Sequence, residues 1–489
     1  MSLTRRKPLE ALLQQASHSG LKRTLTAKSL VALGVGAIIG AGLFVRTAAA
    51  SAEAAGPAVV ISFVIAAIGC AFAGLCYAEF AAMIPIAGSA YTYAYTTMGE
   101  FAAWIIGWAL ILEYALGAAT VAISWSEYLN KLFGGSIPYQ WCHSPMQTSD
   151  TGVQGLFNIP ALIIVLLLTL ILIKGVQESA TVNAIIVVIK VTIVIVFIAV
   201  GWHFISGANL HPFTIPANTP GHEDYFKHGW PGVLGGASIV FFAFIGFDAV
   251  STAAQETKNP GRDMPKGILG SLALCTVLYI LFGYVLTGVC NWKEFGMSGK
   301  EASVAYAVDH YMPGYNWLAT AITVAILLGF SSVILVMLLG QSRVFFSMAN
   351  DGLLPKLFSA VHPKFRTPYK ANIVLFFFVG AFAAFIPESL AGDLTTVGTL
   401  FAFVLVCFGV IIMRRLRPEL HRPFRTPLVP VVPILGVIVC GGMIVSLDHR
   451  SQITAFCWML LGLFVYFLYG RTHSKLAGPA VYEPAPAGD

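Results

Sequence analysis

Charge is scarce in this chain of 489 residues: Asp, Glu, Lys and Arg make up 11% of it, against about 25% of an average soluble domain. Its eleven histidines and eight cysteines are scattered, without the spacing typical of a metal site. The first 29 residues are polar and lack the apolar core of a cleavable signal peptide. These absences argue against a soluble domain, a metal site and a cleaved leader, and no cofactor is expected.

Long apolar runs are abundant instead. Hydrophobic residues make up 57% of the chain, and about 20 of them in a row suffice to cross a bilayer as a helix. We therefore predict an all-α membrane protein with twelve transmembrane helices and no separate soluble domain. The predicted spans are 30–50, 57–80, 101–127, 158–174, 182–206, 232–254, 267–289, 317–346, 371–386, 395–413, 429–446 and 453–470.

The basic residues indicate how these spans are oriented. If the chain starts inside, most of its 29 Lys and Arg residues fall in inside segments, as the positive-inside rule requires. The net charge of +6 then reflects membrane orientation, and no nucleic-acid partner is expected. We expect a multi-pass protein of the cell membrane, in a bacterium the inner membrane, with cytoplasmic tails at 1–29 and 471–489. The basic inside loops after spans 6, 8 and 10 are expected to anchor the protein at anionic headgroups.

Glycines interrupt spans 1 and 6, which stand five spans apart. Because five is an odd number, the second block of five helices must cross the membrane in the opposite sense to the first. Interrupted helices at matching places of such an inverted repeat indicate a binding site at the bilayer midplane. We therefore predict a core at 30–413, built from repeats at 30–206 and 232–413, followed by two additional helices at 414–470.

The first interruption lies in "GVGAIIGAGLF", residues 34 to 44, and three interpretations of its glycines compete. A nucleotide-binding loop needs a preceding strand and a soluble helix, which an apolar span does not provide. Close helix packing is a serious alternative, since small residues four apart let membrane helices approach. In that interpretation Gly34 and Gly36 pack against spans 5 and 8. The third interpretation is a helix that unwinds near Ile38 to Gly42.

Unwinding exposes backbone groups that must find partners, since each unsatisfied group at membrane depth costs about several kcal/mol. A zwitterionic amino acid would supply both kinds of partner, because helix N-termini favour carboxylates and free carbonyls accept from an ammonium group. In span 6, Gly246 interrupts the helix, and the phenylalanines beside it either close over a ligand or belong to the core or the lipid face. The predicted substrate-binding residues are Ile38, Gly40, Ala41 and Gly42 in span 1 and Phe242, Ala243 and Ile245 in span 6.

Long stretches of the chain resemble a known family. The segments "CYAEFAAMIPIAGSAYTYAYTTMGEFAAWIIGWALILEYALG" and "FFAFIGFDAVSTAAQETKNPGRDMP" are similar to the amino acid, polyamine and organocation transporter superfamily, and within it to its cationic amino acid transporter branch. The resemblance is specific over about residues 25–355 and looser beyond. It implies alternating access through two inverted five-helix repeats, with helices 1 and 6 broken, plus two further helices.

Lys190 is the most informative ionisable residue, because a lysine at the centre of a span costs about 2.5–3.5 kcal/mol and must face protein or water. In proton-driven relatives a span 5 lysine replaces the sodium ion of sodium-driven ones. Carried over, Lys190 would link Gly36 or Ala37 to span 8 near Ser331 and Ser332 and would couple transport to protons. A permanently charged structural tether is the alternative.

Four other charged residues lie in or next to spans. Glu113 in span 3 and Asp248 in span 6 are candidates for proton coupling, and Glu113 also for the pocket wall; Asp248 alternatively caps the broken helix. Glu79 is expected to be an interfacial charge at the inner end of span 2. Arg46 is expected to snorkel or to act as a gate at the outer side.

Met337 in span 8 falls where animal members of the branch that select arginine and lysine have a small polar residue. A methionine there would shorten and dry the pocket. We therefore expect a proton-coupled symporter of alanine and other small or neutral L-amino acids, with cationic ones as possible further substrates. An exchanger or facilitated transporter for arginine and lysine without proton coupling is the alternative.

Other classes of protein fit less well. The spans lack the continuous polar stripe of a channel and the clustered acid, base or metal set of an intramembrane enzyme. The expected partners are an amino acid, protons and the lipid bilayer. A small accessory subunit and the pairing of Cys142 with Cys290 remain open at this point.

Overall fold

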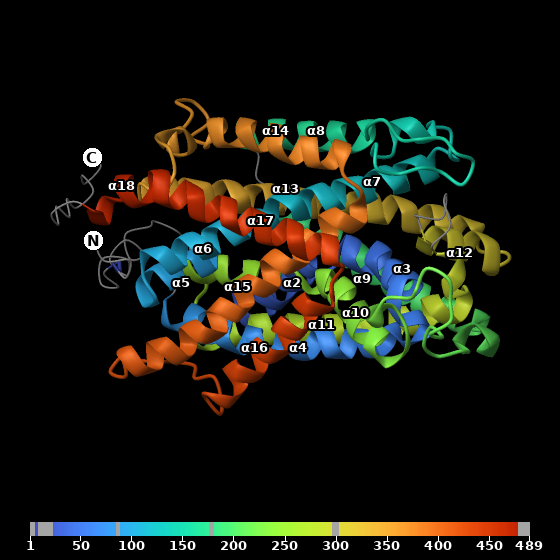
Figure 1. The fold of residues 1–489 in the computed structure, drawn as a ribbon, viewed down its shortest axis with the longest axis horizontal. Coiled ribbons are helices and arrows are strands. Elements are labelled where there is room, and N and C mark those ends of the chain that lie inside the picture. The colour runs from blue at the N-terminus through green and yellow to red at the C-terminus, as the bar shows by residue number, and fades with distance from the viewer. Residues whose placement is uncertain (1–4, 8–22, 85–88, 176–179, 296–302, 478–489) are drawn as a thin grey trace.

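The computed structural model describes residues 5–7, 23–84, 89–175, 180–295 and 303–477. Over these residues the chain is helical, and its β-structure is confined to two isolated bridges. The long helices run side by side along the longest axis of the molecule (Figure 1). The α-helices are α2 (Ala27–Ile38), α3 (Thr47–Ala50), α4 (Val59–Met83), α5 (Ser89–Thr97), α6 (Glu100–Ile111), α7 (Gly117–Leu132), α8 (Ile159–Lys174), α9 (Ala180–Gly201), α10 (Gly229–Phe241), α11 (Pro260–Val289), α12 (Ser303–Tyr311), α13 (Asn316–Asn350), α14 (Tyr369–Phe385), α15 (Glu388–Leu416), α16 (Val431–Ser446), α17 (His449–Val465) and α18 (Arg471–His473).

The expectation of an all-α membrane protein is confirmed. In the described part of the chain, eight helices are long and apolar enough to cross a membrane. Four shorter apolar helices, α2, α8, α14 and α16, overlap further predicted spans. The count of twelve crossings and their grouping into two inverted repeats stay predictions.

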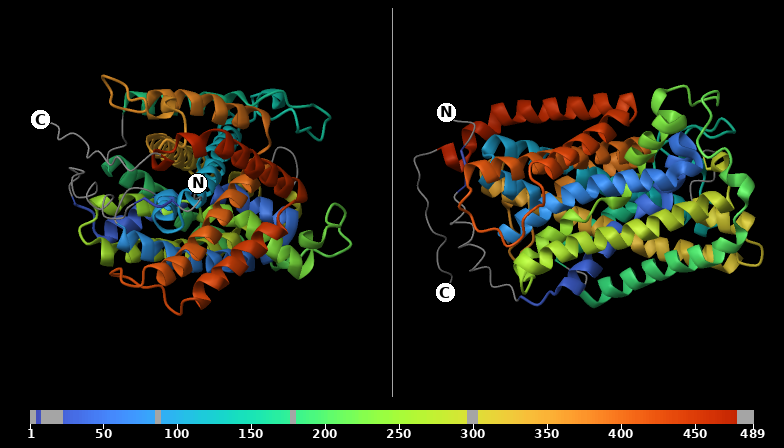
Figure 2. Two further views of the ribbon diagram at one scale, coloured as in Figure 1. Left: turned by 60° about the vertical axis from the view of Figure 1, so that its left-hand side comes forward. Right: turned by 90° about the horizontal axis from the view of Figure 1, so that it is seen from below.

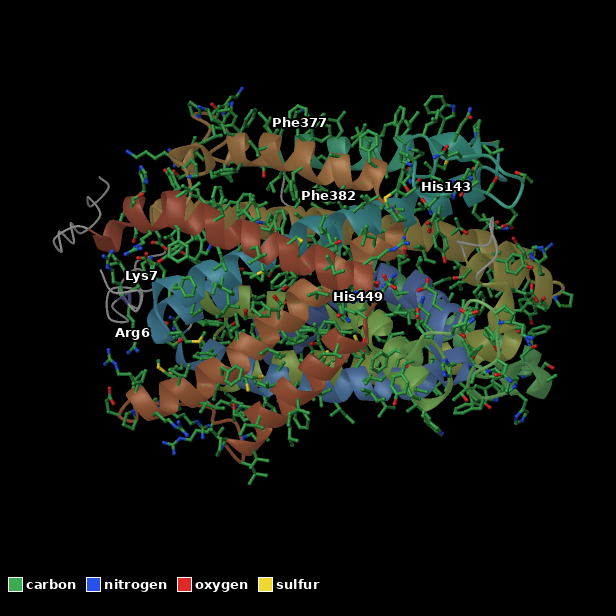
Figure 3. The ribbon with its side chains drawn as sticks, viewed as in Figure 1. Arg6, Lys7, His143, Phe377, Phe382 and His449 are labelled. Atoms are coloured by element: carbon green, nitrogen blue, oxygen red, sulfur yellow. The ribbon has the colours of Figure 1, made fainter. Side chains whose placement is uncertain are left out.

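The bundle is organised around α4 and α11, which pack against each other (Figure 2). Helix α2 packs on α11 and α9, and α10 packs on α4. Helices α8 and α14 lie together along one edge of the bundle (Figure 1). Phe377 on α14 points away from the bundle and is 67% exposed, as expected of a side chain that faces lipid (Figure 3). Residues 38–42 and 242–246, where the interruptions are predicted, are all buried within this bundle.

Candidate functional site

The first predicted interruption is present and is narrower than expected. Helix α2 ends at Ile38, and Ile39 adopts an extended conformation with φ −73° and ψ 105°. The chain turns helical again at Ala41 and continues as the π-helix η1 (Gly42–Arg46). The break is thus confined to Ile39 and Gly40, because both flanking segments keep helical geometry.

The second interruption lies in the span predicted at 232–254. Helix α10 passes into a 3₁₀ turn, η9 (Phe242–Phe244), and Ile245 is extended. Gly246 follows with φ +110°, and the 3₁₀-helix η10 (Asp248–Glu256) then begins. A β-carbon on Gly246 would strain this φ and would lie 2.8 Å from the carbonyl oxygen of Ala37. Glycine is therefore required here by backbone conformation and by the proximity of α2.

The two interruptions touch each other. A β-carbon on Gly42 would overlap the backbone of Ala243, so the half-helix after the first break lies directly against η9. The Tyr279 hydroxyl of α11 lies 3.0 Å from the Ile38 carbonyl oxygen and 2.9 Å from that of Ala243. One side chain of α11 thus joins both breaks. Sequence reasoning missed Tyr279, since nothing in its neighbourhood distinguishes it from a lipid-facing tyrosine.

Lys190 of α9 is bound to the first break. Its Nζ donates to the carbonyl oxygen of Gly36 at 2.8 Å and to that of Ile39 at 2.9 Å, and the residue is only 2% exposed. A β-carbon on Gly329 of α13 would lie 3.0 Å from the Lys190 Cδ, so the side chain also packs on the predicted span 8. The structure therefore brings Lys190 to Gly36, as the resemblance implies, and adds Ile39.

The backbone groups of the first break divide into two sets. The carbonyls of Ile38 and Ile39 accept from Tyr279 and Lys190, and a carbonyl oxygen keeps a second lone pair for another donor. The amides of Gly40, Ala41 and Gly42 stand at the start of a half-helix, where the first N–H groups have no intrahelical acceptor. Acceptors and donors thus face the break from its two sides.

A pair of buried carboxyl groups lies next to the interruptions. Glu113 is fully buried on a π-helix, η4 (Leu112–Leu116), an irregularity that is frequent at functional sites. Its nearest polar neighbours are the carboxyl group of Asp248 and the hydroxyl group of Thr399. Asp248 is 2% exposed, interacts electrostatically with Glu113 and accepts from the Tyr114 hydroxyl at 3.0 Å. A carboxylate unpaired at this depth is costly, so this pair requires a proton or a cation.

The other predicted pocket residues are buried. Met337 lies against span 3, because a β-carbon on Gly117 would be 3.0 Å from its Sδ, and Thr395 of α15 flanks the same point. Met337 is 6% exposed and Phe242 4%, so the phenylalanine does not face lipid. A β-carbon on Gly40 would contact only the Val333 side chain, at 3.3 Å.

Arg46 does not snorkel. Its side chain is fully buried and forms ion pairs with Glu388, at 3.4 Å, and with Asp393, both on α15. Asp393 also accepts from the Ser451 hydroxyl at 3.2 Å. The half-helix after the first break is therefore tied to α15, and the two acidic partners were not identified from the sequence because they lie some 340 residues further along the chain.

Two further expectations are corrected. Glu79 is 2% exposed rather than interfacial: it accepts from Arg414, at 3.0 and 2.7 Å, and from the Thr426 amide at 2.7 Å, so it fixes the loop after α15. Gly34 packs against span 7 rather than spans 5 and 8, since its β-carbon would lie 2.5 Å from the Ser271 Oγ.

The structure has two broken helices in contact with each other inside a bundle of apolar spans. This arrangement is typical of multi-pass membrane transporters with discontinuous transmembrane helices. Comparison with known proteins agrees with this class and narrows it. Residues 25–468 match the family model described as amino acid permease, and the chain belongs to that family.

Several curated relatives are similar over most of their length. The chain is 42% identical to the branched-chain amino acid permease BcaP of Bacillus subtilis, over 97% of the chain and 99% of the relative. It is 41% identical to the methylthioribose transporter of the same organism, with the same coverage. It is 34% identical to the vacuolar cationic amino acid transporter 4 of Arabidopsis thaliana, over 86% of the chain and 68% of the relative. The protein is accordingly a transporter and not an enzyme.

Proposed function

We propose that the protein is a proton-coupled symporter of alanine and other neutral L-amino acids, which it moves by alternating access. The observation that carries this proposal is the bond between Lys190 and the first helix break. Its ammonium group donates to two backbone carbonyls, that of Gly36 in the last turn of α2 and that of Ile39 in the break itself. Hydrogen bonds from a charged donor are about twice as strong as neutral ones. Gain or loss of the Lys190 proton would therefore change how firmly the break is held.

In this mechanism the substrate completes the break. Its carboxylate binds the amides of Gly40, Ala41 and Gly42, where the half-helix dipole is positive. Its ammonium group binds remaining acceptors on Ile38 and on Ile245 and Phe242 of the second break. Glu113 and Asp248 serve as further proton sites or contact a substrate side chain.

The free energy of one proton is sufficient for such a transporter. A charge that crosses 100 mV supplies about 2.3 kcal/mol. At about 1.36 kcal/mol for each factor of ten, this energy supports roughly 50-fold accumulation of a neutral substrate. A sodium ion is not needed, because the Lys190 ammonium occupies the position beside the first break.

The proposed substrate range rests on the apolar wall and on the relatives. Met337, Phe242 and Ile245 would surround a small or apolar side chain. The relative named a branched-chain amino acid permease adds valine, leucine and isoleucine to alanine as candidates. Methylthioribose belongs among the compounds tested, because a relative of 41% identity is named for its transport.

A second candidate is exchange or facilitated diffusion of arginine and lysine without proton coupling. It is favoured by the relatives named cationic amino acid transporters and by Glu113, a fully buried carboxyl group without a cationic ion-pair partner among the described residues. In this case Glu113 would pair with the cationic side chain, and Lys190 would stay charged throughout the cycle.

Uptake into proteoliposomes distinguishes the two candidates. Labelled alanine, leucine and arginine are offered with an imposed proton gradient, an imposed sodium gradient or neither. Accumulation of alanine or leucine that requires the proton gradient supports symport. Arginine uptake that is independent of both gradients, without accumulation of neutral substrates, would replace it by the second candidate. Protease accessibility of tags fused to the two termini, in right-side-out and inside-out vesicles of bacterial inner membrane, tests the cytoplasmic placement of both termini.

A further inference from the structure

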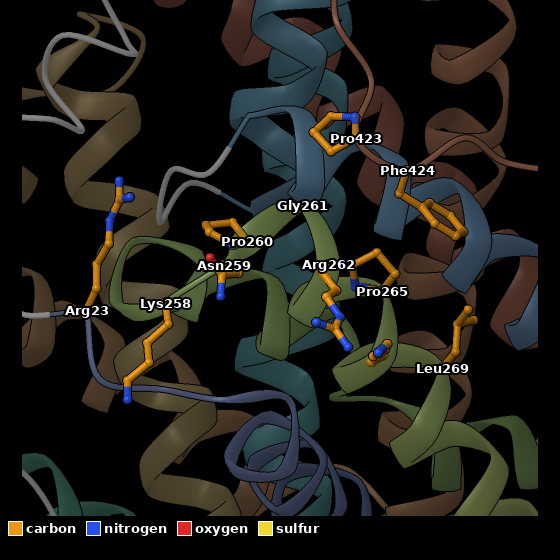
Figure 4. Close-up of a pocket in the computed structure, with 11 residues that line it drawn as sticks. Arg23, Lys258, Asn259, Pro260, Gly261, Arg262, Pro265, Leu269, Pro423 and Phe424 are labelled. Carbon is orange, nitrogen blue, oxygen red and sulfur yellow. The ribbon is translucent and has the colours of Figure 1, made fainter.

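A cavity of about 850 Å³ lies away from the helix breaks, at the end of the bundle that holds the start of α11. Its wall combines Arg23, from the segment before α2, with residues around the start of α11 and with Pro423 and Phe424 from the loop between α15 and α16. Figure 4 shows Arg23 and Lys258 on one side of the cavity and Phe424 on the other. Three segments far apart in the sequence therefore meet at one hollow.

The cavity is strongly basic. Arg23, Lys258, Arg262 and Lys266 all line it, and all four side chains are exposed. None of the four forms an ion pair or a side-chain hydrogen bond with another described residue. Asp263, in the first turn of α11, is the neighbouring acid, and the positive end of the α11 dipole points the same way. The cavity thus offers an anion four cationic side chains that have no ion-pair partner among the described residues.

The surroundings of the cavity favour an anion that carries an apolar tail. Lys266 stands on the same face of α11 as Leu274, Val277 and Leu281, since these residues follow it at helical spacing. These three side chains are 45%, 57% and 36% exposed, although they lie in a span. An acyl chain that lies along this face would leave its headgroup at the cations. A soluble anion would make no use of that apolar face.

We propose that this cavity binds the phosphate headgroup of an anionic phospholipid, with an acyl chain along α11. The positions of the cations agree with the general preference of basic pockets between transmembrane helices for such headgroups.

The site is connected to the helix breaks through the backbone. The amides of Thr24 and Leu25, next to Arg23, donate to the Glu256 carbonyl oxygen, each at 2.9 Å. The Lys258 amide donates to the Leu25 carbonyl oxygen at 2.9 Å. Leu25 leads into the start of α2, and Glu256 is the last residue of η10. A headgroup bound at the cavity would therefore link α11 to the ends of both broken helices that lie farthest from the breaks. An anionic lipid would therefore restrain these two half-helices.

Lipid binding to the full-length protein tests the proposal directly. The purified protein in a neutral detergent is titrated with phosphatidylglycerol or with phosphatidylcholine, and binding is measured by native mass spectrometry. The test variant carries Lys258→Gln, Arg262→Gln and Lys266→Gln. The matched control carries the same charge change at three exposed lysines outside the cavity and outside the basic loops after spans 6, 8 and 10, with Lys174→Gln, Lys293→Gln and Lys475→Gln.

The expected result is tighter binding of phosphatidylglycerol than of phosphatidylcholine by the unaltered protein. A cation near an anionic headgroup contributes about fivefold in affinity, so the test variant is expected to bind phosphatidylglycerol about 100-fold more weakly. The control variant is expected to stay within about threefold. Equal losses in both variants, or no preference for the anionic lipid, would overturn the proposal.

Two further arms keep the test decisive. If inorganic phosphate at millimolar concentration displaces phosphatidylglycerol completely, the site binds a soluble anion and the lipid assignment is wrong. If the triple variant does not fold, the single variant Arg262→Gln is used; it is expected to lose about fivefold in affinity, and an unchanged affinity would contradict the proposal. Lipid binding is measured without transport, so its outcome is independent of the proposed function.

Discussion

Replacement of Gly42 by alanine tests whether the contact between the two breaks is as close as the structure indicates. The added β-carbon would overlap the Ala243 backbone, which no change of rotamer relieves. Overpacking of this kind costs about 1–3 kcal/mol, and we expect the upper end because the obstacle is backbone. At about 1.36 kcal/mol for each factor of ten, the arrangement in which the breaks touch would become about 100-fold less populated.

Gly40→Ala is the matched control for this substitution. It adds the same methyl group two residues away, where its nearest neighbour is the Val333 side chain at 3.3 Å. Thermal unfolding in detergent and the initial rate of uptake are measured for both variants. We expect Gly42→Ala to lower the melting temperature and to abolish most uptake, and Gly40→Ala to change either much less. If Gly42→Ala keeps both values of the unaltered protein, the inferred contact is wrong.

Three other substitutions have definite expected outcomes. Met337→Ser removes the apolar wall at Gly117 and should raise arginine uptake; unchanged arginine uptake with intact alanine uptake would contradict its place in the pocket. Glu79→Gln leaves its Arg414 partner without a counter-charge and should cost about 3 kcal/mol, visible as a lower melting temperature in detergent. Gly246→Ala should impair folding or uptake more than Gly40→Ala. Its β-carbon would be strained at φ +110° and would also press on the carbonyl oxygen of Ala37. Equal effects of the two substitutions in the uptake assay would argue against a rigid second break.

Much of the fold follows from physical rules that act locally. Apolar runs long enough for a bilayer predict the helices, and glycines inside such runs predict both interruptions. The position of the first break was expected over 38–42 and is observed at Ile39 and Gly40. The break is shorter than expected because Ala41 and Gly42 have helical geometry. Gly42 begins the half-helix that packs against the backbone of Ala243.

The contacts between distant segments were harder to predict. Lys190 was expected near Gly36 through the family resemblance, since periodicity alone does not say which helices are neighbours. Glu79 illustrates the limit: its position at the end of a span suggested the membrane interface, but a loop more than 300 residues later folds back and buries it. The pairing of Arg46 with Glu388 and Asp393 depends in the same way on how α15 packs.

The measurement that tests the proposed mechanism most directly is alanine accumulation by Lys190→Ala in proteoliposomes with an imposed proton gradient. Tyr279→Phe is the control, since it removes the hydroxyl that lies within hydrogen-bond distance of the Ile38 and Ala243 carbonyl oxygens and donates to one of them at a time, without removing the lysine amine. We predict that Tyr279→Phe still concentrates alanine, whereas Lys190→Ala only equilibrates it, a loss of up to about 50-fold in accumulation. Proton-driven accumulation by Lys190→Ala would contradict the role assigned to Lys190.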